Sequence, residues 1–303
     1  MKKIEVNTLI FTAFAMCAFA ANSFFCRAAL GAGQIDPASF TAIRLISGAI
    51  TLWLCLRIQN KGGQQGSWVG AWALFGYAVL FSMAYLYMST GTGALILFAS
   101  VQLSMIAYAA TQGDRLKGLR ALGAVVAAAG LVLLLWPHLQ TPASVLAAAS
   151  MALAGACWGV YSVVGKGSQS PLADTAGNFS RAAFLMVLVW MAVYFSAKAG
   201  MHIPGVTVER GLALYTVYLP TPTVAGVLFA LASGCLASGI GYAVWYKVLP
   251  ALPTTSAASV QLSVPVIAAL AGVVFLNEAV TATLLVAMVM TLGGVYLVLR
   301  AKR

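Results

Sequence analysis

The sequence Ser100-Val101-Gln102-Leu103-Ser104 occurs a second time in this chain, as Ser259-Val260-Gln261-Leu262-Ser263. Both copies lie inside long apolar segments, about half the chain length apart. The flanks agree as well, because Ala84–Tyr87 (AYLY) and Ala243–Tyr246 (AVWY) precede the two copies by the same distance. Repetition at this period predicts a chain made of two related halves.

The composition indicates a membrane protein. Of the 303 residues, 62% are hydrophobic and 8% are charged, whereas roughly 25% of an average soluble domain is charged. Apolar runs of about 20 residues recur along the chain, and each is long enough to span the hydrocarbon core of a bilayer as a helix. We therefore expect an all-α polytopic protein in the lipid bilayer. The net charge of +11 does not indicate nucleic-acid binding, since the basic residues lie between the apolar runs.

The apolar runs predict ten transmembrane helices, five in each half. The first half, residues 1–140, and the second half, residues 141–303, are expected to form one compact unit divided by the linker Pro137–Pro142. The expected spans are 8–30, 36–58, 68–88, 93–112, 118–136, 144–165, 172–198, 222–248, 253–276 and 281–300. Thr90–Gly93 and Pro250–Pro253 are interpreted as helix breaks at matching positions.

The first apolar run could instead belong to a cleaved signal peptide, with Ala18-Phe19-Ala20 as the cleavage site. The run continues well past Ala20, however, and Phe19–Arg27 resembles Trp158–Lys166 in the second half. A segment with an internal counterpart is expected to remain in the mature fold.

An odd number of spans in each half makes the two repeats inverted in the membrane. With a cytoplasmic N-terminus, the basic residues divide unequally between the two sides, as the positive-inside rule requires. Twelve fall on the cytoplasmic side (Lys2, Lys3, Arg57, Lys61, Arg115, Lys117, Arg120, Lys166, Lys247, Arg300, Lys302 and Arg303) and three on the outer side (Arg27, Lys198 and Arg210). Both termini are therefore expected to be cytoplasmic.

These features resemble the EamA repeats of the drug/metabolite transporter superfamily. Each half has an aromatic or Gly-Ala-Asn-like segment in its first helix and an arginine in its second, Arg44 and Arg181. Val264-Pro265-Val266-Ile267 leading to Phe275-Leu276-Asn277-Glu278 is similar to the family's ninth-helix pattern, whereas Ser104-Met105-Ile106 in the first half lacks the proline. The aromatic-rich segments most resemble bacterial aromatic amino-acid exporters. The resemblance implies a ten-helix exporter of the bacterial inner membrane, with alternating access around a central cavity.

Polar residues deep inside spans indicate the candidate substrate site. A polar side chain exposed to lipid is unfavourable, so such residues are expected to point into the bundle. Gln102 and Gln261 are related by the repeat and lie near the expected midplane, where their amides suit a zwitterion. They could equally bond neighbouring helices. The expected substrate-binding set is completed by Asn22, Tyr85, Trp158, Tyr242 and Trp245. Core packing is the alternative role for Trp158. The nearby Tyr246 is expected to belong to the aromatic belt at the membrane interface.

Arg44 and Arg181 are the charges placed well inside the expected spans, where an unpaired charge is costly. We expect them to contact substrate in the cavity or to anchor neighbouring helices. All six acidic residues fall at helix ends or in loops, which favours uniport or exchange over proton coupling.

The sequence predicts a transporter and not an enzyme. It has no GxxxxGK[ST] motif and no cluster of cysteine, histidine or carboxylate residues, so no cofactor and no metal are expected. The expected partners are a small-molecule substrate and the lipid bilayer. The protein is expected to be a monomer or a weak dimer. The fifth and tenth spans are expected to be peripheral helices or to form a subunit interface. Aromatic and other neutral amino acids are the expected substrates. A multidrug or nucleotide-sugar transporter of the same superfamily is the alternative.

Overall fold

The computed structural model describes residues 6–59, 62–112, 118–136, 142–165, 168–198, 222–251 and 260–300. Within these ranges the regular elements are all helical, and none is a strand. Ser259, the linker residues 137–141 and residues 252–253 of the expected break lie outside the described residues. Several of the basic residues counted above also lie outside them: Lys2, Lys3, Lys61, Arg115, Lys117, Lys166, Arg210, Lys302 and Arg303.

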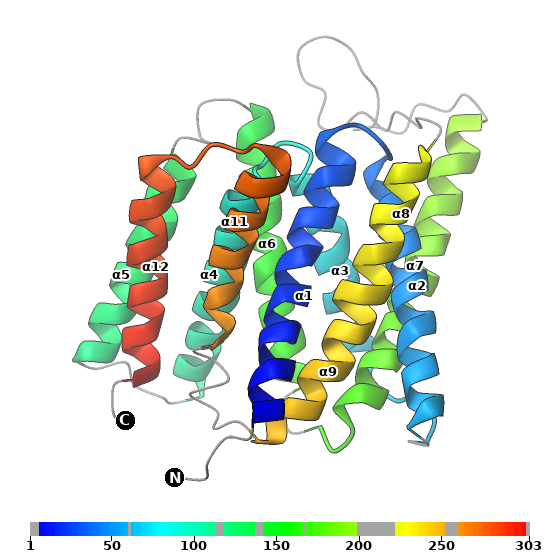
Figure 1. The fold of residues 1–303 in the computed structure, drawn as a ribbon, viewed down its shortest axis with the longest axis horizontal. Helices are drawn as coiled ribbons and strands as arrows, with labels where there is room; N and C mark the ends of the chain where they lie inside the picture. The colour runs from blue at the N-terminus through cyan, green and yellow to red at the C-terminus, as the bar shows by residue number, and fades with distance from the viewer. Residues whose placement is uncertain are drawn as a thin grey trace.

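The helices follow the expected spans closely (Figure 1). In chain order they are α1 (Val6–Gly31), α2 (Pro37–Ile58), α3 (Trp68–Ala84), α4 (Thr90–Thr111), α5 (Leu119–Leu135), α6 (Pro142–Val164), α7 (Pro171–Lys198), α8 (Val224–Ala232), the π-helix η2 (Ser233–Ile240), α9 (Gly241–Val248), the 3₁₀ turn η3 (Leu249–Ala251), α11 (Ser263–Leu276) and α12 (Ala282–Arg300). α8, η2 and α9 form one continuous helical segment.

Length and composition make this a multi-pass membrane fold. Five helical segments among the described residues are long and apolar enough to cross a bilayer: 6–31, 37–58, 90–111, 145–164 and 224–248. Four apolar helices of 10–17 residues accompany them. Large apolar side chains such as Ile50, Val125 and Val289 are exposed on the outside of the bundle, as lipid contact requires.

Several helices begin or end at residues that satisfy the free backbone groups there. The Asp36 side chain accepts the Ser39 N–H and caps α2, and Ser89 caps α4 in the same way. The interpretation of Thr90–Gly93 as a helix break is therefore wrong, because these residues form the first turn of α4. α11 ends at Asn277, which takes the left-handed conformation (φ 52°), one that asparagine tolerates better than most residues.

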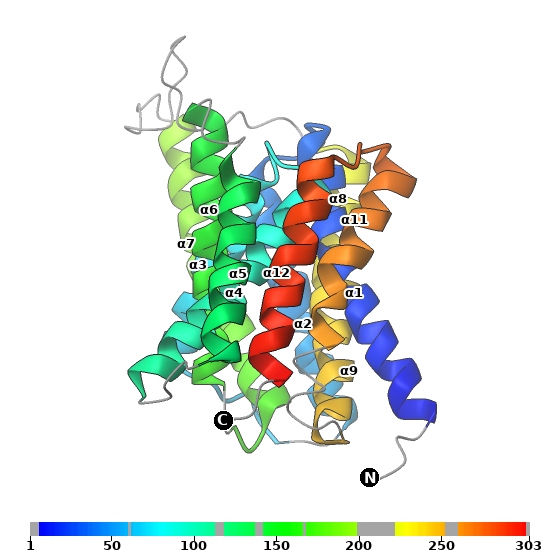
Figure 2. The ribbon, with the colours of Figure 1, turned by 90° about the vertical axis from the view of Figure 1, so that its left-hand side faces the viewer.

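The helix contacts occur in corresponding pairs. α6 packs against α3 and α4, and α1 packs against α11, η2 and α9. α2 packs against α7, and α5 packs against α12. Figures 1 and 2 show α5 and α12 side by side at one edge of the bundle, away from its centre. The contacts of α1 with η2 and α9 thus parallel those of α6 with α3, and the contact of α1 with α11 parallels that of α6 with α4.

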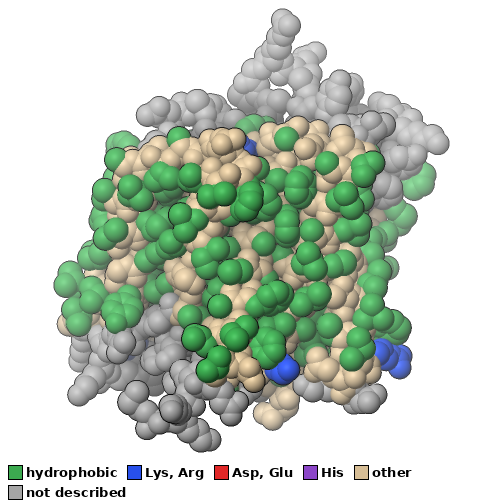
Figure 3. Space-filling model, viewed as in Figure 1, with side chains coloured by type: hydrophobic (Ala, Val, Ile, Leu, Met, Phe, Trp, Pro, Cys, Tyr) green, Lys and Arg blue, Asp and Glu red, His purple; other side chains and the backbone are tan. Residues whose placement is uncertain are grey.

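Exposed basic side chains lie at one end of the bundle, and apolar side chains cover its middle (Figure 3). α1 begins and α12 ends at the bottom of Figure 1, which we call the lower end; the other is the upper end. Arg57 and Lys247, in the last turns of α2 and α9, are exposed. Figure 3 shows hydrophobic side chains over the middle of one face and lysine or arginine only near its edges. This distribution is that of a protein whose middle contacts hydrocarbon.

Candidate functional site

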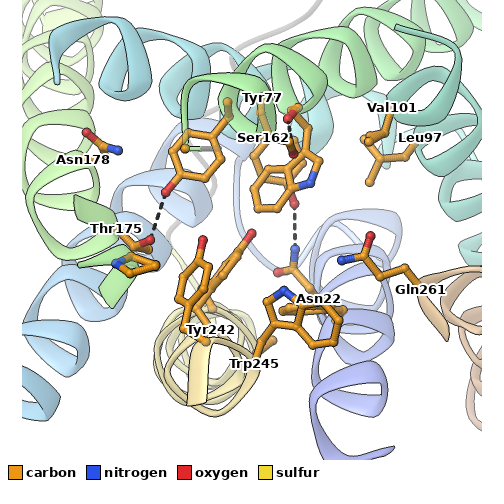
Figure 4. Close-up of a pocket in the computed structure, with 18 of the residues that line it drawn as sticks. Asn22, Tyr77, Leu97, Val101, Ser162, Thr175, Asn178, Tyr242, Trp245 and Gln261 are labelled. Atoms are coloured by element: carbon orange, nitrogen blue, oxygen red, sulfur yellow. Dashed lines mark hydrogen bonds between the residues drawn. The ribbon is translucent and has the colours of Figure 1, made fainter. Parts of the chain in front are cut away.

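A cavity of about 540 Å³ lies between α1, α3, α4, α6, α7 and the segment η2–α9 (Figure 4). Its volume is within the range of pockets that enclose a small molecule. The lining reaches from Phe81 on α3 to Gly165 and Pro171 in the turn between α6 and α7, at the lower end. The cavity therefore extends from the middle of the bundle towards the lower end.

The structure brings five of the seven expected substrate-binding residues to this cavity. They come from α1, α6, α9 and the residues just before α11: Asn22, Trp158, Tyr242, Trp245 and Gln261. Figure 4 shows the Asn22, Tyr242, Trp245 and Gln261 side chains around one space. Whether they contact substrate stays a prediction.

Tyr85 and Gln102 do not line the cavity, which corrects their expected place. The Tyr85 ring is fully buried near the upper end, and its hydroxyl donates to the Thr90 carbonyl at 3.3 Å. Gln102 is buried within α4. Of the two glutamines that the repeat relates, only Gln261 lines the cavity, because α4 and α11 are not packed identically around it.

Aromatic rings form much of the wall. The Trp158 ring is at the centre of this group, with centroids 4.7 Å from Tyr77, 5.3 Å from Tyr161 and 5.4 Å from Tyr242. Phe19 lies 5.2 Å from Tyr242. Rings at these separations interact favourably in tilted arrangements, and together they offer a large apolar surface to a bound molecule.

A chain of polar contacts crosses this aromatic wall. Ser233 Oγ donates to Asn22 Oδ1 at 2.5 Å, and Asn22 Nδ2 donates to the Tyr77 hydroxyl at 3.0 Å. Arg44 Nη2 donates to the same hydroxyl at 2.9 Å. These four residues lie on η2, α1, α3 and α2, so the contacts join helices that are distant in the sequence.

The π-helix η2 lies within the wall. A π-helical turn has a wider spacing than an α-helix and is often found at functional sites. Here η2 contributes Ser233, which bonds Asn22, while Ser238 lines the cavity. Gly234 allows η2 to approach α2 closely, since a Cβ there would lie 2.5 Å from the Arg44 carbonyl oxygen.

Arg44 and Arg181 are not cavity-lining residues. Arg44 is 1% exposed and lies behind Tyr77 and Phe81, with its guanidinium 5.1 and 5.0 Å from their ring centroids. Arg181 lies at the lower end, where it donates to a loop carbonyl and sits over Trp68. Arg181 thus contacts the loop before α3, whereas its role towards substrate stays a prediction.

The segment 65–67 between α2 and α3 is held on one face of α7 at the lower end. Asp174 Oδ1 and Asn178 Oδ1 each accept an N–H of this segment at 2.9 Å, and Arg181 Nη1 donates to one of its carbonyls at 2.7 Å. Residues spaced four and three apart share a helix face. Asp174 and Asn178 also line the cavity, so this loop attachment lies at its rim.

At the upper end, two side chains connect four elements. Arg27 Nε pairs with Glu278 Oε1 at 3.3 Å, and Arg27 Nη1 donates to the carbonyls of Tyr85 and Leu86. Glu278 Oε2 accepts the Thr90 N–H at 2.8 Å. We call Arg27 and Glu278 the upper ion pair. It joins α1, α3, α4 and the end of α11 above the cavity.

Sequence reasoning missed Tyr77, the residue on which the polar contacts converge. A usable signal was present, since Tyr77, Phe81 and Tyr85 recur every four residues on α3 and therefore share one face. Their ring centroids lie 5.2 and 4.8 Å apart along the helix, in a tilted and an edge-to-face arrangement. Tyr161 and Thr175, which bond each other at 3.3 Å, are further cavity residues without a distinctive sequence pattern.

An all-helical membrane bundle with a central small-molecule cavity defines a transporter-like protein. The family model of the EamA-like transporter family matches residues 145–300. An uncharacterized protein of Pseudomonas aeruginosa, PA1977, is 42% identical over 295 residues, which cover 97% of this chain and 94% of that protein. The chain belongs to the EamA-like transporter family, whose members are membrane transporters of the drug/metabolite type and generally not enzymes.

A solved crystal structure has the same fold. It superposes with a TM-score of 0.64 and covers 96% of each chain at 19% sequence identity. At this identity the similarity concerns the fold alone. Neither relative's description names a substrate.

Proposed function

We propose that this protein exports aromatic and other neutral amino acids, or similar small metabolites, by alternating access. In this proposal ten helices form two inverted repeats, 1–140 and 141–303, in a bacterial inner membrane with both termini in the cytoplasm. The lower end is then cytoplasmic, and the described state has its cavity directed inward. A monomer or weak dimer is sufficient for this mechanism.

The corresponding helix contacts support the inverted repeat. Contacts such as α3 with α6, and η2–α9 with α1, are what a two-fold axis in the membrane plane produces. Arg57 and Lys247 at the lower end support a cytoplasmic position for that end.

The composition of the cavity wall is the observation that carries the substrate class. Stacked rings around Trp158 suit an aromatic or apolar side chain, and the amides of Asn22 and Gln261 suit the charged groups of an amino acid. Substrate would enter from the lower end while the upper ion pair keeps the other end closed. Breaking that pair and closing the lower end would expose the same cavity to the outside.

The wall is less suited to the alternative substrates. The described lining residues include no lysine or arginine, although a nucleotide sugar needs cations for its phosphates. Asp174 is the acidic residue among them, and it already accepts bonds from Gly66 and Ser168. A cationic drug would therefore meet a single carboxylate in the described part of the wall, and both of its oxygens already accept hydrogen bonds from the protein.

Transport by the purified full chain in proteoliposomes tests the proposal. Uptake of radiolabelled phenylalanine, threonine and a cationic dye would be measured with and without a pH gradient. We expect saturable phenylalanine flux that Trp158→Ala lowers by about tenfold in kcat/KM, since Trp158 contacts three cavity rings. Trp72→Ala, on the exposed face of α3, is the matched control and should transport normally. Dye flux without amino-acid flux would contradict the proposal and support the multidrug alternative.

A further inference from the structure

The Tyr77 hydroxyl has an unusual set of partners. Its oxygen accepts one hydrogen bond from Asn22 Nδ2 at 3.0 Å and another from Arg44 Nη2 at 2.9 Å. A hydroxyl has two acceptor positions and one proton. Both acceptor positions are therefore occupied, and the proton must be donated in a third direction.

A molecule bound in the cavity is positioned to accept this proton, because Tyr77 lies in the cavity wall. Tyr77 is 4% exposed and lines the cavity, and its ring is held between Trp158 at 4.7 Å and Phe81 at 5.2 Å. No described residue accepts a hydrogen bond from its hydroxyl. A buried donor without a partner is costly, so an acceptor atom on a bound molecule would satisfy it.

Arg44 adds a positive charge that no carboxylate compensates. Its Nε and Nη1 atoms are buried and have no hydrogen-bond partner, and the ion pair found among the described residues is that of Arg27 and Glu278. A buried charge of this kind is unfavourable unless an opposite charge lies nearby. An anion that accepts the Tyr77 proton would lie near the guanidinium, because Arg44 bonds the same hydroxyl, and it would compensate the positive charge.

The two observations reinforce each other. A hydroxyl that accepts a bond from a cation becomes a stronger donor, because hydrogen bonds in a chain polarise one another. Ser233 extends the chain by donating to Asn22, which orients the Asn22 amide so that its NH₂ group faces Tyr77. The whole chain of contacts thus presents one strengthened proton to the cavity.

We propose that Tyr77 donates this proton to a carboxylate oxygen of the substrate, and that Arg44 is the positioning residue that strengthens the donor. Tyr77 then recognises the anionic end of the substrate, while the rings around Trp158 enclose its apolar body. This inference rests on the proposed function, since it names the group by which that same cavity would bind an amino acid.

Three ligands that differ in one group each test the proposal. Phenylalanine has both charged groups, 3-phenylpropionate lacks the amine, and phenethylamine lacks the carboxylate. Binding to the purified full chain would be followed by intrinsic tryptophan fluorescence, to which Trp158 and Trp245 in the cavity contribute. We expect both carboxylates to bind roughly ten- to hundredfold more tightly than phenethylamine, as hydrogen bonds to charged groups require.

Variants assign this preference to residues. Tyr77→Phe and Arg44→Gln should each lower the affinity for the two carboxylates by about tenfold and leave phenethylamine binding unchanged. Tyr161→Phe is the matched control: Tyr161 also packs on Trp158, but its proton already bonds Thr175. Its effect should be the same for all three ligands. If Tyr77→Phe fails to fold, the wild-type ligand series still tests the proposal.

The outcomes separate this inference from the proposed function. Equal affinity for all three ligands, or an equal loss for all three in Tyr77→Phe, would overturn the role of Tyr77. A carboxylate preference without amino-acid flux in proteoliposomes would uphold it and contradict the proposed substrate. Amino-acid flux without a carboxylate preference would support the proposed substrate and contradict the role of Tyr77.

Discussion

Arg27 and Glu278 are 251 positions apart in the chain and form an ion pair at 3.3 Å at the upper end of the bundle. Arg27 lies five residues beyond Asn22 on α1, which places it about 7.5 Å further along the helix axis. The same two side chains also bond the backbone at the end of α3 and the start of α4. Any opening of the cavity at the upper end must therefore break this pair.

Glu278→Gln is expected to favour opening at the upper end. The pair is only partly buried, with side-chain exposures of 27% and 13%, so its loss is worth about 1 kcal/mol, or roughly a fivefold shift. Ser23→Cys, one turn below Arg27 and in the cavity wall, would report the opening. A membrane-impermeant thiol reagent added on the upper side should modify it about five times faster in Glu278→Gln, in a background without the five native cysteines.

Two further variants test this interpretation of the upper ion pair. The exchange Arg27→Glu with Glu278→Arg should return the modification rate towards the original value. Arg57→Gln, a charge change on an exposed residue at the lower end, should leave the rate unchanged. An unaltered rate in Glu278→Gln would show that the pair does not control access.

Gln261 and Gln102 should affect transport from opposite sides. Gln261 lines the cavity in the described state, and Gln102 does not. If the repeats are inverted, the other state exchanges their environments. Gln261→Ala is then expected to raise KM several-fold for substrate on the cytoplasmic side, and Gln102→Ala for substrate on the outer side. Flux would be measured in both directions in oriented proteoliposomes. If each variant changed KM equally on the two sides, the expectation would be wrong.

The neighbouring glycines Gly293 and Gly294 should respond differently to alanine. A Cβ on Gly294 would lie 2.5 Å from backbone atoms of Gly123 and Ala127 on α5, whereas a Cβ on Gly293 would meet nothing within 4 Å. Gly294→Ala must separate α5 from α12 and should cost about 1–3 kcal/mol. Gly293→Ala should be neutral or slightly stabilising. Thermal unfolding in detergent would compare them, and similar melting temperatures would contradict the close packing.

Two serines of η2 form a second matched pair. Ser233 donates to Asn22, while the buried Ser238 hydroxyl has no partner among the described residues. Ser233→Ala leaves a buried amide oxygen without its donor and should destabilise the fold by about 1–3 kcal/mol. Ser238→Ala removes an unsatisfied hydroxyl and should be neutral or stabilising. Denaturation of both variants would test this, with a larger loss for Ser238→Ala as the contrary result.

The positions of the helices followed well from the sequence. Each apolar segment is long enough to indicate its own helix, and caps such as Asp36 before Pro37 mark helix starts by local chemistry. The one misplaced break, Thr90–Gly93, shows the limit of local signals: glycine and threonine are poor helix formers, but the Ser89 cap begins the helix before them.

The site followed only in part. Polar or aromatic residues within apolar segments were correctly identified as pointing inward, and Asn22, Trp158, Tyr242, Trp245 and Gln261 do line the cavity. Tyr85 satisfies the same sequence criteria but packs against Gly93 near the upper end. Composition can show that a side chain avoids lipid, but it cannot distinguish the cavity from the core.

The sequence alone therefore determined the helical segments, the repetition marked by SVQLS and the lipid environment of the bundle. These features depend on local hydrophobicity and spacing. The tertiary structure decided that Gln261 and not Gln102 faces the cavity, and that Arg44 and Asn22 meet at the Tyr77 hydroxyl. It also paired Arg27 with Glu278 across most of the chain. These contacts depend on how each helix is rotated and packed against distant ones, which no single segment specifies.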